Sequence, residues 1–128
     1  MDGLHLTADL RDCDTTLAAM IDPQALRQLC LAAVMGAGLQ PVGELFHPFP
    51  APGGVTGVVL LAESHLAVHT WPELAAVTLD VYVCNYGNDN TDRAHSLLNA
   101  LIASFGAKGI DRQALQRGVL PTPTGATT

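Results

Sequence analysis

Residues 63–73 bring together side chains that can do chemistry. This short segment holds a serine, two histidines, two glutamates and the single tryptophan of the chain. Hydroxyl, imidazole and carboxylate groups are the usual nucleophiles and proton carriers of enzymes. A largely apolar run, Val55–Leu61, comes shortly before it. A buried strand that leads into reactive side chains is where an active site is expected.

Metal binding is the first chemistry to consider, with His65 and His69 as ligands and Cys84 and His47 as additional ones. A spacing of four residues places two histidines on one side of a helix or of a strand. The chain has no Cys-x-x-Cys pair, and no glutamate follows His65 directly. Neither a structural zinc site nor the His-Glu-x-x-His pattern fits, so we expect no metal.

Nucleophilic catalysis has two forms here. Ser64 or Cys84 paired with a histidine would make a hydrolase; the Gly-x-Ser-x-Gly elbow is absent, but a triad formed by tertiary proximity stays open. Alternatively, the Ser64 hydroxyl attacks the carbonyl of Glu63 and converts the amide to an ester. That path needs a strained or turned peptide, an oxyanion donor and a base. Elimination would then leave a pyruvoyl group, whose ketone forms a Schiff base and withdraws electrons. The residues permit each path.

The elements that must position this segment follow from hydrophobic spacing and turn residues. Asp22 and Pro23 are typical of a helix N-terminus, and Gly36 and Gly38 of its end. A second helix begins at Asn90 or Thr91 and stops before Gly106. Strands are expected over residues 4–10, 41–46, 55–61, 65–71 and 77–84, with a short one near 108–111.

Two helices cannot cover both faces of so wide a sheet. We therefore predict an α+β fold, a two-layer α/β sandwich with a mainly antiparallel sheet and two helices packed on one face. Strict alternation over residues 77–84 puts Asp80, Tyr82 and Cys84 opposite Val81 and Val83. If the valines meet the helices, Cys84 faces the uncovered side, which is free for a partner or a site.

Composition limits the partners. The net charge is −6 and the six Lys and Arg residues are scattered, which excludes a nucleic-acid-binding surface. Three cysteines are too few for a disulfide framework, and the acidic N-terminus does not fit a signal peptide. No apolar run approaches the ~20 residues of a membrane span. We expect one cytoplasmic domain over residues 1–120 and a disordered tail over 121–128.

The motif Glu-Ser-His-Leu-x-x-His-Thr-Trp-Pro-Glu at residues 63–73 resembles the processing site of the prokaryotic S-adenosylmethionine decarboxylase proenzyme family. Three companion motifs stand in that family's order and spacing, so the resemblance covers roughly residues 3 to 105. They are Phe46-His47-x-Phe49, Gly54-Val55-x-Gly57-Val58 and Asp80-x-x-x-Cys84.

The resemblance implies that the proenzyme cleaves itself between Glu63 and Ser64, giving chains 1–63 and 64–128. Ser64 would become the pyruvoyl cofactor that forms the Schiff base with S-adenosylmethionine. His69 matches the histidine implicated in processing. The product would supply the aminopropyl donor for spermidine synthesis.

Further roles follow from the same resemblance. Cys84 matches the cysteine that returns a proton to the substrate α-carbon, and thiols are mostly protonated at neutral pH. Phe49 matches an aromatic that stacks on adenine, and Glu73 a residue that binds the ribose hydroxyls. The family assembles as a homodimer with sites near the interface.

The chain departs from the family pattern at three places, and two alternative functions stay open. Thr56 stands where relatives usually carry a serine that assists processing; its methyl group restricts χ1, so we expect slower processing that still occurs. Leu74-Ala75-Ala76 replaces a common aromatic and glycine, and Asn85 follows Cys84 in place of glycine. The alternatives are an arginine or ornithine decarboxylase on the same scaffold, and an unprocessed homologue without catalysis.

Trp71 and Cys30 are expected in the core.

Overall fold

The computed structural model describes residues 2–118 of the chain; the tail expected at 121–128 lies outside them. The strands are β1 (Gly3–Arg11), β2 (Pro41–Pro48), β3 (Val55–Leu61), β4 (Ser64–Trp71), β5 (Ala76–Cys84) and β6 (Gly109–Arg117). The helices are α1 (Pro23–Gly36) and α2 (Thr91–Ser104), with short 3-10 turns η1 (Ala18–Met20) and η2 (Pro72–Leu74).

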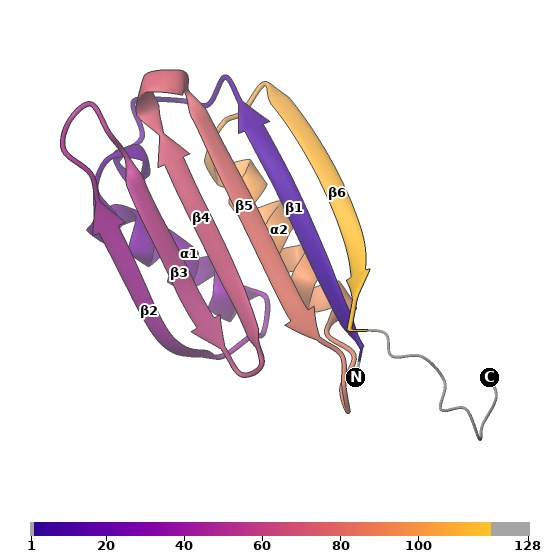
Figure 1. Cartoon of the computed structure of the whole chain (residues 1–128). Helices are drawn as coiled ribbons and strands as arrows, with labels where there is room; N and C mark the ends of the chain where they lie inside the picture. Colours follow the sequence, from indigo (N-terminus) through magenta and orange to yellow (C-terminus); the bar gives the residue numbers. More distant parts are fainter. Residues whose placement is uncertain (1, 119–128) are drawn as a thin grey trace.

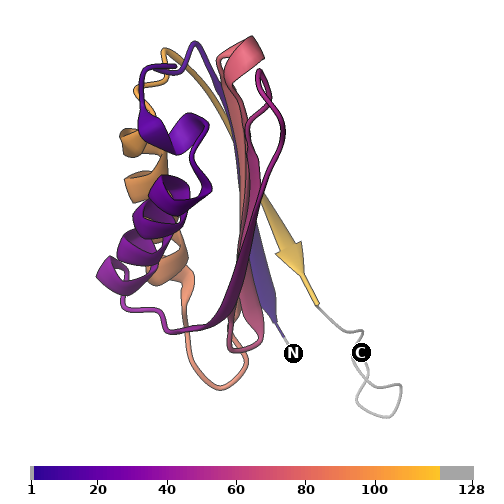
Figure 2. The ribbon, with the colours of Figure 1, turned by 90° about the vertical axis from the view of Figure 1, so that its left-hand side faces the viewer.

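The described strands form a single sheet of order β2-β3-β4-β5-β1-β6, in which every neighbouring pair is antiparallel. Figure 1 shows the six strands side by side, and Figure 2 shows both helices packed on one face of the sheet. The predicted two-layer α+β sandwich is confirmed. The opposite face of the sheet carries no element of the described chain.

Alternation along the strands builds the core beneath the helices. Leu6, Ala8 and Leu10 of β1 are at most 2% exposed and pack with the apolar sides of α1 and α2. The N-terminus of α1 forms as its sequence predicts, because the Asp22 carboxylate accepts a hydrogen bond from the backbone N–H of Gln24.

Two strands are longer than the sequence indicates. β2 continues to Pro48, and β6 runs over nine residues where only a short strand near 108–111 was expected. Both lie at edges of the sheet. The side chains of β6 are almost all exposed, so it shows no apolar alternation. Its strand character comes from backbone pairing with β1 along its full length.

Thr70 is a buried polar residue that links three segments. Its hydroxyl accepts a hydrogen bond from the Val55 N–H at 2.8 Å and donates to the Met20 carbonyl at 2.8 Å. Replacing Thr70 by valine keeps the volume but leaves two buried backbone groups without this partner. We expect a loss of about 1–3 kcal/mol in the free energy of unfolding, measured by urea denaturation. An unchanged denaturation midpoint would contradict this role.

Candidate active site

Four of the predicted site residues line one cavity at the end of the sheet where β4 finishes. A cavity of about 280 Å³ is bounded by Phe49, Thr56, His69 and Glu73, together with Trp71. β3 and β4 supply Thr56 and His69, which are direct partners across the two strands. We call this group the histidine end. It opens beside a second, more apolar cavity of about 440 Å³ that shares Phe49 and Glu73.

His69 is held on two sides. Its Nδ1 atom lies 3.0 Å from the Thr56 hydroxyl, so the methyl group of threonine does not prevent this contact. The Trp71 indole stacks on the imidazole, with ring centroids 5.6 Å apart and planes 24° from parallel. These contacts fix the ring and leave Nε2 as the atom available for proton transfer.

The remaining predicted residues meet at the opposite end of β4, which we call the serine end. Ser64 Oγ accepts a hydrogen bond from the backbone N–H of Cys84 at 3.1 Å. Glu63 directly precedes it in the tight turn between β3 and β4, with φ at +58°. A glutamate in this left-handed region is strained. The turned peptide that self-cleavage requires is therefore present at the Glu63–Ser64 bond.

Cys84 differs from the other two thiols in its surroundings. Burial raises the pKa of Cys30 to about 12. Burial, with the neighbouring Asp12 carboxylate, also raises the pKa of Cys13. Cys30 is fully buried in the core, as predicted. Cys84 is the cysteine whose backbone contacts Ser64, and all three are free.

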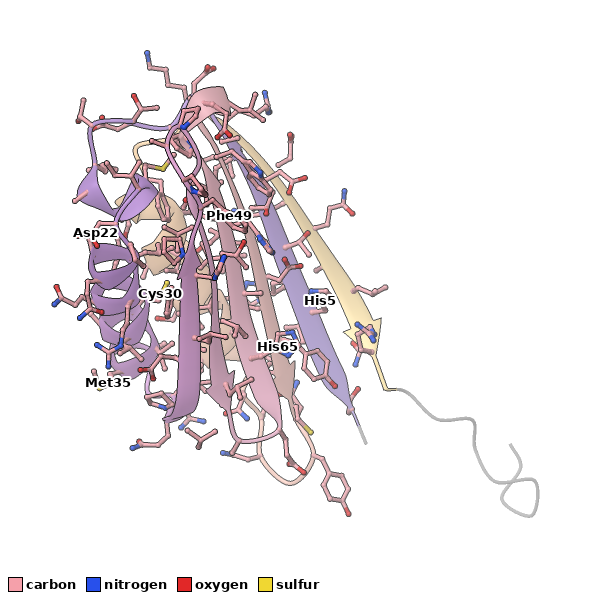
Figure 3. The ribbon with its side chains drawn as sticks, turned by 60° about the vertical axis from the view of Figure 1, so that its left-hand side comes forward. His5, Asp22, Cys30, Met35, Phe49 and His65 are labelled. Atoms are coloured by element: carbon pink, nitrogen blue, oxygen red, sulfur yellow. The ribbon has the colours of Figure 1, made fainter. Side chains whose placement is uncertain are left out.

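The two ends cannot meet within one chain. Ser64 and His69 are five residues apart on the same strand, which separates them by about 17 Å. In Figure 3, Phe49 and His65 mark the histidine end and the serine end of the sheet. Residues 63–73 thus look like one reactive cluster in sequence but divide into two half-sites.

The prediction that Trp71 lies in the core is wrong. We expected a core residue, but its side chain is half-buried and lines the cavity against His69. The alternation of β4 contains the signal, because Leu66, Val68 and Thr70 face the helices. Trp71 therefore falls on the same face as His69.

Among residues 2–118, no group of three or more His, Cys, Asp or Glu side chains is arranged to hold a metal ion. His65 and His69 share a face of β4 but have different neighbours: Tyr82 stacks on one and Trp71 on the other.

None of the described helices is long and apolar enough to cross a membrane.

The fold is that of a known class of decarboxylases. The crystal structure of the adenosylmethionine decarboxylase from Aquifex aeolicus superimposes with a TM-score of 0.82 at 36% identity, covering 94% of each chain. This likeness confirms the α+β class and identifies the class of enzyme.

Sequence comparison identifies the family. The S-adenosylmethionine decarboxylase family model matches residues 4–118. The S-adenosylmethionine decarboxylase proenzyme of Aquifex aeolicus is 37% identical over 118 residues, 92% of this chain and 82% of that one. The proenzyme of a Sulfurihydrogenibium species is 38% identical over 119 residues, 93% and 84% of the two chains. The chain belongs to the S-adenosylmethionine decarboxylase family.

Proposed function

We propose that this protein is a pyruvoyl-dependent S-adenosylmethionine decarboxylase that supplies the aminopropyl donor for spermidine biosynthesis. The observation that carries the proposal is the serine end. There the Ser64 hydroxyl stands directly after a left-handed Glu63 and contacts Cys84, in a chain of this family. The relatives reported above are named for S-adenosylmethionine, which favours it over arginine or ornithine as substrate.

Self-cleavage would begin at the strained turn. Ser64 Oγ adds to the Glu63 carbonyl carbon, the Ser64 nitrogen leaves, and an ester replaces the amide. Loss of the Ser64 α-proton then expels the Glu63 carboxylate, which ends the chain 1–63. Water replaces the nitrogen of residue 64 and releases ammonia, so a ketone remains at the start of chain 64–128. The left-handed φ of Glu63 supports the first step, because its release offsets part of the barrier.

The serine end has groups suited to hold a pyruvoyl cofactor. The Cys84 N–H already donates to the oxygen of residue 64, and this backbone donor remains after cleavage. When present, the ketone would condense with the substrate amine and withdraw electrons as carbon dioxide leaves. Cys84 would then donate its thiol proton to the substrate α-carbon. In this proposal the backbone N–H of Cys84 holds the cofactor, and the thiol of the same residue donates the proton.

A second copy of the chain would complete the site. His69 and Thr56 are too far from Ser64 of their own chain to act on it. In a two-fold dimer with the uncovered sheet faces packed together, the histidine end of one copy can meet the serine end of the other. Three large leucines that face away from the helices support this packing: Leu45, Leu60 and Leu115 are 71%, 49% and 57% exposed.

The histidine end would bind the nucleoside part of the substrate. Phe49 is 49% exposed at the boundary of both cavities, and an aromatic face suits adenine and a sulfonium cation. The Glu73 carboxylate can accept hydrogen bonds from the two ribose hydroxyls. Arginine and ornithine have neither an aromatic base nor a ribose, so these residues favour the nucleoside substrate.

The mechanism requires a free thiol at Cys84. All three cysteines are unpaired, which fits a reducing compartment such as the cytoplasm.

Cleavage and turnover are tested together on the purified protein. Denaturing electrophoresis and intact mass should show chains 1–63 and 64–128, with a ketone in place of the serine amine. Carbon dioxide release should follow with S-adenosylmethionine and stay at background with arginine and ornithine. A single full-length chain after long incubation would support the unprocessed homologue, and release from arginine or ornithine would reassign the substrate.

A further inference from the structure

The loop between β5 and α2 lies beyond the end of the sheet (Figure 1) and holds the last residue of β5. That residue is Cys84, and the pairing of β5 with β4 already stops two residues earlier, at Tyr82. The side-chain amide of Asn90 donates a hydrogen bond to the Cys84 carbonyl at 2.9 Å. A side chain thus pairs a backbone carbonyl that lies outside the β4–β5 ladder.

Both peptide groups that flank the Cys84 α-carbon are held. On one side, the Cys84 N–H donates to Ser64 Oγ at 3.1 Å. On the other side, Asn90 binds the Cys84 carbonyl. The N–H of that same peptide group, which belongs to Asn85, donates to the Asp2 carbonyl at 2.7 Å. Because each peptide group is planar, fixing both of them sets φ and ψ of Cys84 and thereby the direction of its Cα–Cβ bond.

The Asn90 side chain is itself held by α2. Its Oδ1 atom accepts a hydrogen bond from the Arg93 guanidinium at 2.9 Å. Arg93 in turn lies over the turn after α1, where a Cβ atom built on Gly38 would be 3.4 Å from Arg93 Nε. Asn90 is the N-cap residue of α2, yet within residues 2–118 its side chain makes no capping hydrogen bond. Asparagine usually caps with this side chain, and here the side chain binds Cys84 and Arg93 instead.

We infer that Asn90 is a positioning residue for turnover, which keeps the Cys84 thiol aimed at the substrate. This role rests on the proposed function of Cys84 as proton donor. In that step the S–H bond breaks, its electron pair stays on sulfur, and the proton goes to the substrate α-carbon beside residue 64. A misplacement of about 1 Å at a reacting group can cost about 100-fold in rate. Asn90 touches no reacting atom and acts through the Cys84 main chain.

Asn90→Asp keeps the size of the side chain and the acceptor for Arg93, but removes the amide that binds Cys84. Aspartate is as good an N-cap as asparagine, and its charge suits a helix N-terminus, so the urea midpoint of unfolding should not fall. We expect kcat, counted per cleaved chain, to fall about tenfold. KM for S-adenosylmethionine should stay unchanged, because Phe49 and Glu73 lie at the histidine end.

Hydrogen–deuterium exchange of the Asn85 amide is a readout that needs no turnover. This N–H lies in the same peptide group as the Cys84 carbonyl, so losing the Asn90 amide should loosen it. We expect its exchange to become about tenfold faster in Asn90→Asp. Mass spectrometry of fragmented peptides that contain residue 85 measures the rate.

Asn88→Asp is the matched control. It makes the same change and adds the same charge two residues away, on an exposed side chain, so kcat and exchange of the Asn85 amide should keep their wild-type values. Asn90→Ala removes the amide without adding a charge, and its kcat should fall as far as that of Asn90→Asp. A loss of kcat in Asn90→Asp alone would assign the effect to the new charge and overturn the inference.

The exchange rate also separates the role of Asn90 from the proposed function. If the wild-type protein released no carbon dioxide, the proposed function would fail, and the Asn85 amide would still show whether Asn90 holds the Cys84 backbone. If turnover were normal and Asn90→Asp kept the wild-type kcat, the proposed function would stand and the role of Asn90 in turnover would be wrong. Faster exchange with an unchanged kcat would make Asn90 purely structural.

Discussion

Ser64→Ala is expected to leave one uncleaved chain of 128 residues with no decarboxylase activity. Alanine has no hydroxyl to add to the Glu63 carbonyl, so neither the ester nor the ketone can form. The fold should survive, because the Ser64 hydroxyl accepts one hydrogen bond, from the Cys84 N–H. Its loss costs about 0.5–1.5 kcal/mol. Denaturing electrophoresis, intact mass and carbon dioxide release measure the result.

Cys84→Ala is the control that separates processing from turnover. It keeps Ser64 and the Cys84 backbone N–H, so the chain should still cleave, while decarboxylation falls by at least about 100-fold. Cleavage or a ketone in Ser64→Ala would refute the self-cleavage path. Full activity in Cys84→Ala would instead contradict the role of Cys84 as proton donor, while the self-cleavage path would still stand.

Most of the fold is readable from short-range patterns. Alternation predicts β1 and β5, and an apolar run predicts β3, each to within a residue or two. Asp22 and Pro23 locate the start of α1. The edge strand β6 was underestimated because its stability comes from backbone pairing with β1, which leaves no apolar period in the sequence.

The candidate site was harder to predict than the fold. Spacing within residues 63–73 shows which groups can react, but not that an eight-residue strand separates them. Ser64 and Cys84 are brought together by pairing of β4 with β5, and His69 and Thr56 by pairing of β3 with β4. Such contacts depend on register. Trp71 was misplaced for a different reason: large aromatics pack in cores and in pockets alike.

Two inactive variants should restore activity when they are produced in the same cell. His69→Ala disables the histidine end and Cys84→Ala the serine end. If each site combines one end from each copy, a mixed dimer holds one site with both residues intact and one with neither. Random assembly makes about half of the dimers mixed, so activity should recover to about a quarter of the wild-type value. Carbon dioxide release from the unfractionated co-produced protein measures it, and the affinity-purified mixed dimer should show about half of the wild-type value.

Cleavage in the mixed dimer is a second, independent readout. The His69→Ala chain should be cut, because the partner supplies the histidine, whereas the Cys84→Ala chain should stay whole. Ser64→Ala combined with Cys84→Ala is the matched control: both changes lie at the serine end, so no intact site can form and no activity should return. If mixed dimers of the first pair showed only the summed activity of the parents, each site would lie within one chain. The 17 Å separation along β4, about five strand residues, argues against that outcome, since both ends belong to the same rigid, fully paired strand.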